Sequence, residues 1–326
     1  MYHKIIASVS VLAMSMLMTI AAVAETYPSR PITMVVGFGI GGSADRMTRS
    51  TVTFLSDALE VPVKVVNKKG AGTMLANNYL LRRPADGYTV LGSTFSPYMS
   101  VSILMSGAKY SINDFAFINA QWFDRDIVAV HKDSPYKSLP ELVKAIKNNP
   151  KKISCAVVQG SSGHLMSALL LKEYGVPLEN MNLVTYQSGG KARSAIAGNQ
   201  VSFIIIGNEG SMGIKEFLRP LAFVDSKGSK KWNAPAVNDA LKPLGYEVPL
   251  LSGSIRGFAV SRKFKEQYPE RFDKLVQAFK TTLTNKDVKK FLKRVNIGHE
   301  WTGPDEIDRL MKENHAAYVK YKDLLN

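Results

Sequence analysis

Short apolar runs alternate with longer amphipathic stretches along most of this chain, a pattern typical of strands followed by helices. In the first part of the chain the apolar runs are 31–36, 63–66 and 88–91, and the amphipathic stretches are 44–59 and 74–81. Since alternation of this kind builds a sheet with right-handed crossover helices, we predict an α/β fold.

The same pattern starts again near residue 126 and gives way to helices after residue 260. Its predicted strands are 127–130, 153–158, 183–186, 201–206 and 255–260, and its predicted helices include one from Ser138, 165–174 and 191–197. Ligands bind beyond the carboxyl ends of strands in such sheets. We therefore predict two lobes, each a mostly parallel sheet flanked by helices, with a ligand cleft between them. Residues 25–126 and 250–326 form the predicted lobe 1, and residues 127–249 form the predicted lobe 2.

The first 24 residues have the pattern of a secretory signal peptide. His3 and Lys4 form a short polar start, residues 5–20 are largely apolar, and Ala22-Val-Ala24 fits the small-x-small cleavage pattern. The alternative is an uncleaved membrane anchor, because the apolar run approaches spanning length. We favour cleavage before Glu25 and export to the periplasm. No later apolar segment approaches spanning length, so we expect the mature chain to be soluble.

Composition argues against several kinds of site. Cys155 is the only cysteine, so the fold has no internal disulfide, and we expect its thiol to pack as a small hydrophobe. The five histidines are scattered, and we expect neither a metal nor a cofactor. The net charge is +15, but acids lie among the lysines and no basic and aromatic stripe indicates nucleic acid. A positive field that attracts small anions fits this charge better.

A glycine-rich loop follows the first predicted strand and opens a predicted helix. In Gly37-Phe-Gly-Ile-Gly-Gly-Ser43, backbone N–H groups and the helix dipole favour an anion. The loop also fits the dinucleotide fingerprint, but Asn67-Lys-Lys69 replaces the acid that would bind the ribose. We therefore expect Gly41, Gly42 and Ser43 to contact a small anion. The alternative is a tight turn with nothing bound.

Two side chains beside this loop have structural and functional interpretations. Asp45 fits a helix cap better than a ligand contact, because an acid repels a carboxylate. Phe38 either walls the ligand pocket or seals the core, and the sequence leaves both open.

Polar residues at other strand ends complete the predicted site. These further candidate contacts are Thr94, Ser96, Ser161, Ser162, His164, Gln187, Ser188, Gly189, Asn208 and Arg256. Their hydroxyls, amides and backbone N–H groups suit an anion, and a guanidinium can bind a carboxylate through two parallel hydrogen bonds. The alternatives are a plain turn at Ser188 and Gly189, a packing or capping role for His164 and an ordinary surface position for Arg256.

These motifs resemble the Bug family, the periplasmic solute receptors of tripartite tricarboxylate transporters. Tyr27-Pro-Ser-Arg-Pro-Ile32 and Phe38-Gly-Ile-Gly-Gly-Ser-Ala-Asp45 match the opening of the family. The next two family motifs appear as Asn67-Lys-Lys-Gly-Ala-Gly72 and, with one inserted residue, Pro84-Ala-Asp-Gly-Tyr-Thr-Val-Leu91. Gly160-Ser-Ser-Gly-His-Leu165 and Tyr186-Gln-Ser-Gly-Gly190 approximate two motifs of the second lobe.

The resemblance implies a two-lobed Venus-flytrap receptor without catalysis, a monomer that passes a small carboxylate to membrane transporter subunits. It implies that the loop after strand one holds the ligand carboxylate through backbone groups and bridging water. The chain also departs from the family. Gly39 and Ile40 stand where proline is frequent, Gln187 replaces Lys or Arg, and Arg256 replaces an aromatic residue. Aliphatic di- or tricarboxylates, amino acids and aromatic acids therefore all remain open as ligands.

Two other functions remain open on the sequence. A sensor that presents its ligand to a membrane kinase would share the receptor fold. A periplasmic serine hydrolase would use Ser161 or Ser162 as its nucleophile. However, Gly160-Ser-Ser-Gly163 is not the G-x-S-x-G motif of a nucleophile elbow.

Overall fold

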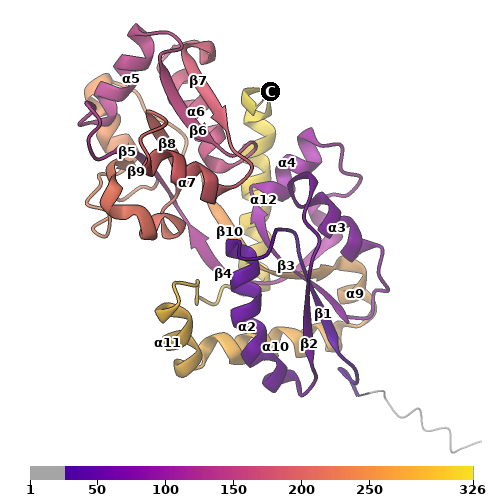
Figure 1. The fold of residues 1–326 in the computed structure, drawn as a ribbon. Coiled ribbons are helices and arrows are strands. Elements are labelled where there is room, and N and C mark those ends of the chain that lie inside the picture. Colours follow the sequence, from indigo (N-terminus) through magenta and orange to yellow (C-terminus); the bar gives the residue numbers. More distant parts are fainter. Residues whose placement is uncertain (1–25, 326) are drawn as a thin grey trace, which may run out of the picture.

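The computed structural model describes residues 26–325, so the predicted signal peptide at residues 1–24 lies outside the described residues. Within this range the chain forms two five-stranded sheets, each covered by helices (Figure 1). We call the first sheet with its helices lobe 1 and the second sheet with its helices lobe 2. No helix in residues 26–325 combines the length and the apolar character that a membrane span requires.

Lobe 1 contains a sheet with the strand order β2-β1-β3-β10-β4. Its strands are β1 (Ile32–Val36), β2 (Val63–Asn67), β3 (Thr89–Ser96), β4 (Phe115–Asp124) and β10 (Ser254–Ser261). β1 pairs in parallel with β2 and β3, whereas β10 is antiparallel to both β3 and β4. The carboxyl ends of β1, β2, β3 and β4 therefore lie at one edge of the sheet, together with the start of β10.

Lobe 2 contains a sheet with the strand order β7-β6-β8-β5-β9. Its strands are β5 (Asp126–His131), β6 (Ile153–Val157), β7 (Met181–Thr185), β8 (Phe203–Gly207) and β9 (Leu218–Phe223). β6 pairs in parallel with β7 and β8, and β5 is antiparallel to β8 and β9. In each sheet a single strand, β10 or β5, opposes the direction of the other four, which agrees with the predicted α/β fold. The antiparallel pairs arise because β5 and β10 are the strands through which the chain enters a lobe from the other one.

Helices cover both faces of the lobe 1 sheet. They are α2 (Ser43–Leu59), α3 (Met74–Leu81), α4 (Tyr98–Met105), α9 (Arg262–Gln267), α10 (Pro269–Thr284), α11 (Lys286–Arg294) and α12 (Pro304–Tyr321). The helix α2 buries Met47, Leu55 and Leu59, which the helical repeat places on one side, against the sheet and α10. α3, α4 and α12 cover the opposite face, where Phe95 and Phe117 of the sheet pack edge to face.

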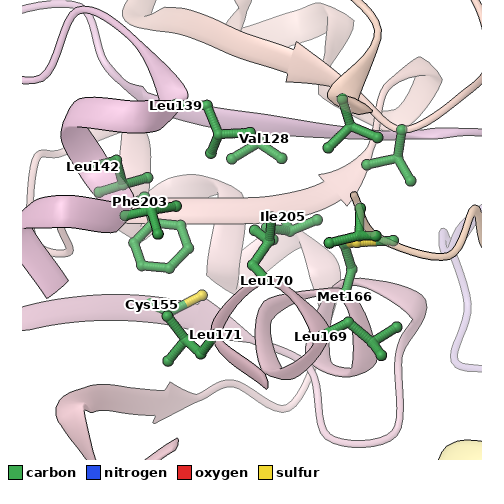
Figure 2. Packing of buried hydrophobic residues seen from close by; sticks show 14 of the residues in the cluster. Val128, Leu139, Leu142, Cys155, Met166, Leu169, Leu170, Leu171, Phe203 and Ile205 are labelled. Carbon is green, nitrogen blue, oxygen red and sulfur yellow. The ribbon is translucent and has the colours of Figure 1, made fainter. Parts of the chain in front are cut away.

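The core of lobe 2 lies between its sheet and α6 (Figure 2). The helices of this lobe are α5 (Leu139–Asn148), α6 (Ser162–Lys172), α7 (Gly189–Ala197) and α8 (Val237–Leu241). Residues 162–171 of α6 are all buried. Met166 and Leu169 pack with Ile205 of β8, and side chains of α4 pack against the same cluster. A helix that is buried on all sides must have protein on each of them, so α6 is a contact point between the lobes.

Three connections join the lobes. The chain leaves β4 and enters β5 with only Arg125 between them, and it returns to β10 after Gly253. These two crossings touch, because a Cβ at Gly253 would lie 2.3 Å from the Asp124 carbonyl oxygen. The third connection is α12, which packs in lobe 1 through Met311 and in lobe 2 through Tyr318. Since Arg125 alone separates the two strands, the edges that carry the strand carboxyl ends face each other there.

Candidate functional site

The glycine loop of lobe 1 ends at a helix terminus without a side-chain cap. Gly42 is the N-cap of α2 and offers no side chain to the free N–H groups of the first turn, which begins at Ser43. Gly41 is exposed and has a φ of +79°, a conformation that favours glycine. Ile40 lies at the loop tip with 81% of its surface exposed. The uncapped terminus can therefore accept an anion from outside the helix.

Asp45 holds this loop in place but does not cap the helix, which corrects the expectation from the sequence. Its carboxylate accepts hydrogen bonds from the Gly41 N–H at 2.9 Å, from Asn67 at 2.8 Å and from Arg49 at 3.0 Å. Burial opposes its ionisation, but the hydrogen bonds from Asn67, Gly41 and Arg49 outweigh burial and lower its pKa. The Gly41 N–H is thus already bound by Asp45, and the Gly42 N–H donates to the Gly39 carbonyl at 3.2 Å, so a ligand must use the N–H groups from Ser43 onward.

Phe38 is half-buried and contacts an aromatic residue of α4. Its ring packs edge to face on Tyr98 of α4, with ring centroids 5.3 Å apart. Tyr98 in turn lies within electrostatic range of Arg256, Asp126 and Arg193, and burial raises the pKa of its hydroxyl. Phe38 is therefore connected to the polar junction between the lobes.

The two predicted serine loops of lobe 2 form helix caps. Ser161 Oγ accepts from the His164 N–H at 3.2 Å, and Ser188 Oγ accepts from the Lys191 N–H at 3.4 Å. Both serines therefore act as N-caps, which accounts for their place directly before the helices. Gly189 is the first residue of α7, and exposed Gln187 lies 3.4 Å from the Lys191 ammonium.

Ser162 and His164 are buried at the start of α6. The hydroxyl of Ser162 hydrogen-bonds the Asp126 carboxyl at the beginning of β5. His164 Nδ1 accepts the Gly160 N–H at 3.3 Å, and burial lowers the pKa of the imidazole. The imidazole is therefore neutral and stabilises its own loop, which agrees with the packing alternative for this histidine.

Three other predicted contacts are engaged within the protein. Thr94 and Ser96 lie inside β3 rather than after it, because the small hydroxyl residues continue the strand and pair with β10. The Ser96 hydroxyl donates to the Gly253 carbonyl at 3.3 Å. Asn208 donates to Asp124 at 3.2 Å and accepts from the Trp232 indole at 3.1 Å. Ser96 and Asn208 thus stabilise the crossings between the lobes.

A buried ion pair lies where the first two crossings meet. Both terminal nitrogens of Arg256 lie 3.4 Å from Asp124 Oδ2, and Arg256 is only 7% exposed. The guanidinium also lies over the Trp122 ring, 4.7 Å from its centroid. The other oxygen of Asp124 accepts the Glu209 N–H at 2.9 Å, from lobe 2. Arg256 is therefore a buried residue of the lobe junction and not an ordinary surface arginine.

Arg193 brings a second guanidinium to this junction, and it was not among the site residues predicted from the sequence. Its Nε donates to Ser211 at 2.9 Å and its Nη2 to the Gly207 carbonyl at 3.1 Å. Its Nη1 points toward the start of α7, where a Cβ at Gly189 would lie 2.9 Å away. Burial lowers its pKa, as does Arg256, whereas Asp124 raises it. A basic residue one turn after a glycine loop was the signal that could have identified it.

Asp126 was also missed as a site residue, although it marks the predicted crossing. Its side chain is 2% exposed at the carboxyl edge of the lobe 2 sheet. Burial, followed by nearby Asp124, raises its pKa to about 7, against the Ser162 hydrogen bond and the two arginines. At neutral pH this carboxyl is only partly ionised, so two arginines and one ionised Asp124 leave the junction with positive charge.

Two shallow surface hollows lie away from this junction. One is on α3, lined by Leu75 and Tyr79 among others, and the other is at residues 228–235. None of the candidate residues lines either hollow. Within residues 26–325, no three His, Cys, Asp or Glu side chains gather as a metal site requires.

The sequence is similar to that of known solute receptors. Residues 47–320 match the family described as the tripartite tricarboxylate transporter family receptor. Protein BugT of Bordetella pertussis is 32% identical over 231 residues, which cover 68% of this chain and 68% of BugT.

Solved structures of such receptors have the same fold. The protein Rpa4515 of R. palustris, solved with adipate, has a TM-score of 0.74 and 22% identity, covering 92% of this chain and 98% of its own. MatC from Rhodopseudomonas palustris, solved with bound malate, has a TM-score of 0.73 and 20% identity, covering 92% of this chain and all of its own. At these identities the likeness shows the two-lobed fold.

Proposed function

This chain belongs to the tripartite tricarboxylate transporter receptor family, and we propose that it captures a small organic carboxylate between its lobes for delivery to membrane subunits of that transporter type. The family and the fold are those of solute-binding receptors and not of enzymes. A serine hydrolase is therefore set aside, in line with the capping role of Ser161 and the neutral, loop-bound His164.

The observation that carries the proposal is the approach of two arginines from different lobes. Arg256 comes from β10 of lobe 1, and Arg193 comes from α7 of lobe 2, with Asp124 near both. Arg256 is buried and Arg193 is half-buried, and the two guanidiniums repel each other. While Asp126 is protonated, only Asp124 balances their charge. A ligand carboxylate between the lobes would supply the second negative charge and would bind both guanidiniums at once.

The uncapped start of α2 supports a second carboxylate position. The N–H groups after Gly42 and the helix dipole there favour an anion, whereas α6 and α7 have serine caps. The neighbours Rpa4515 and MatC were solved with the dicarboxylates adipate and malate. We infer a ligand held by the α2 terminus on lobe 1 and by the arginine pair at the lobe junction.

We propose that the two lobes close on the ligand by hinge bending, because the ligand contacts groups of both lobes. We propose residues 25–126 and 250–326 as lobe 1 and residues 127–249 as lobe 2, with Asp126 at the boundary because β5 of the second sheet begins there. A ligand that binds groups of both lobes stabilises the closed state by its difference in affinity for the two states. We further propose a periplasmic monomer, released by cleavage of the signal peptide at residues 1–24. A sensor that presents ligand to a membrane kinase is the alternative use of the same closure.

The experiment is a thermal-shift and calorimetric screen of residues 25–326 against small carboxylates and amino acids. A native-state ligand at 100 times its Kd stabilises the fold by about 2.7 kcal/mol, which raises the melting temperature.

We expect Gly41→Asp to abolish binding and Gly41→Asn to retain it. Both side chains tolerate the positive φ, so the two variants differ in the negative charge of Asp. Equal binding by both variants would remove the glycine loop from the site, and a folded protein that binds no carboxylate would overturn the proposal.

A further inference from the structure

We propose that Asp126 binds a protonated amine of the ligand, so that the receptor prefers amino carboxylates to the same acids without the amine. This inference rests on the proposed function and assigns one end of the ligand. It is carried by the hydrogen-bonding state of Asp126 and by the arrangement of charges around it.

Asp126 has a buried carboxylate oxygen that the protein leaves unpaired. The side chain is 2% exposed, and its Oδ2 has no hydrogen-bond partner within residues 26–325. Among the described residues, only the Ser162 hydroxyl hydrogen-bonds this carboxyl. A buried carboxylate is stable only when several donors or a cation satisfy it. This oxygen therefore needs a partner, and the described part of the fold does not provide one.

The cations nearest to Asp126 are turned toward other acceptors. Arg256 points its terminal nitrogens at Asp124, and Arg193 donates to Ser211 and Gly207. Both therefore act on Asp126 only through space. An ammonium group is compact and donates in three directions, so it fits a single unpaired oxygen.

Two residues that interact electrostatically with Asp126 also have buried polar atoms without partners among the described residues. Arg256 Nε and the Tyr318 hydroxyl are buried without partners in the described part of the chain. Tyr318 of α12 and Tyr98 of α4 both lie within electrostatic range of Asp126. Donors at Arg256 and Tyr318 could bind a ligand carboxylate, and the acceptor at Asp126 could bind an ammonium group of the same ligand.

The charges around Asp126 also favour a ligand that carries an amine beside its carboxylate. They are Asp124 from β4, Arg256 from β10, Arg193 from α7, Tyr98 from α4 and Tyr318 from α12. With Asp126 ionised, two arginines and two aspartates balance. A zwitterionic α-amino carboxylate group leaves that balance unchanged, whereas a carboxylate without an amine adds an uncompensated charge.

The test compares pairs of acids that differ only in the amine, namely aspartate with succinate and glutamate with glutarate. Calorimetry at pH 8 gives the affinity of each for the wild-type protein, for Asp126→Asn and for the control Asp225→Asn. Asp225 pairs with Arg125 near the same crossing, but it is partly exposed. We expect the wild type and the control to prefer the amino member by roughly tenfold or more, and Asp126→Asn to lose this preference.

The pH dependence of ligand affinity provides a second, independent test. An ammonium group needs the ionised carboxylate, and burial raises the pKa of Asp126 to about 7. The affinity for the amino member should fall about tenfold for each pH unit below 7 in the wild type, and stay level in Asp126→Asn. Tight binding of succinate or glutarate without a preference for the amine would overturn the inference and leave the receptor proposal standing. If the folded protein binds neither member of either pair but binds another carboxylate without an amine, the inference alone is overturned, and if it binds no carboxylate at all, both are overturned.

Discussion

Arg256 and Asn208 belong to different lobes and bind the same carboxylate, that of Asp124. Arg256 lies 3.4 Å from Oδ2, and the Asn208 amide donates to Oδ1 at 3.2 Å. Asp124 therefore connects β10 to the start of η4 (Glu209–Phe217) through one side chain. Any motion of one lobe against the other must preserve or exchange these bonds.

Replacing Asp124 should destabilise the whole protein. Asp124→Asn leaves the Arg256 guanidinium buried without a counter-charge, which costs about 3–5 kcal/mol. Urea unfolding at pH 7.5 measures this loss. The control Glu306→Gln breaks an exposed ion pair with Arg309 and should change stability by less than about 1 kcal/mol. Similar losses in both variants would contradict the role of the buried pair.

Asp126 should make the protein more stable at acid than at neutral pH. Its pKa rises from 3.8 to about 7 on folding, because burial favours the protonated form. The folded state thus binds its proton more tightly, and stability is lost as the pH rises from about 4 to 7. Three pKa units correspond to at most about 4 kcal/mol.

The matched variant isolates this effect from other titrations. Asp126→Asn should equal the wild type in stability near pH 4 and exceed it by up to about 4 kcal/mol at pH 8. Urea unfolding of both proteins across this range measures the difference. A constant difference at all pH values would show that Asp126 does not titrate on folding.

Ser161 should contribute to stability through its cap. Ser161→Ala removes the acceptor of the His164 N–H and should cost about 1 kcal/mol, whereas Ser161→Asp restores an acceptor at the α6 N-terminus. The melting temperatures of the two variants measure this difference. If Ser161→Ala instead keeps its melting temperature and loses only ligand affinity, the serine acts on the ligand and not on the helix.

Gly163 should tolerate no side chain. A Cβ there would lie 1.8 Å from the carbonyl oxygen of Ile205, so Gly163→Ala must push α6 away from β8. We expect a loss of at least about 3 kcal/mol, seen as a lower melting temperature or insoluble protein. Gly213→Ala is the matched control, since nothing lies within 4 Å of its added methyl group. Normal stability of Gly163→Ala would show that the two elements separate easily.

Local sequence patterns were sufficient for most elements. The predicted helix at residues 74–81 matches α3 at both ends, and the loops before α2, α6 and α7 lie where the glycines indicated. The strand β4 was missed because Asn119 and Gln121 interrupt its apolar run. Gln121 is buried with Thr51 of α2 and the Gly298 carbonyl as partners, which no local pattern reveals.

The charged junction was less predictable than the loops. Arg256 was identified only because it departs from a family pattern, and its partner Asp124 is 132 residues away in the chain. Arg193 and Asp126 acquire their surroundings only when the two lobes meet. The spacing of Arg193 after its glycine loop indicates a residue near the site, but its partners depend on the arrangement of whole sheets and have no local signal.

The third connection between the lobes restricts how they can move. Two bodies that touch at one hinge line have a single rotational degree of freedom about that line. The helix α12 attaches to lobe 1 at Ile307 and Met311, and it attaches to lobe 2 at Tyr318 and Tyr321. A rotation that opened the side lined by α12 would have to bend this helix or pull its last turn from the lobe 2 core. For the proposed hinge closure we therefore expect a one-sided movement, with entry and exit of solute on the face opposite the C-terminal helix.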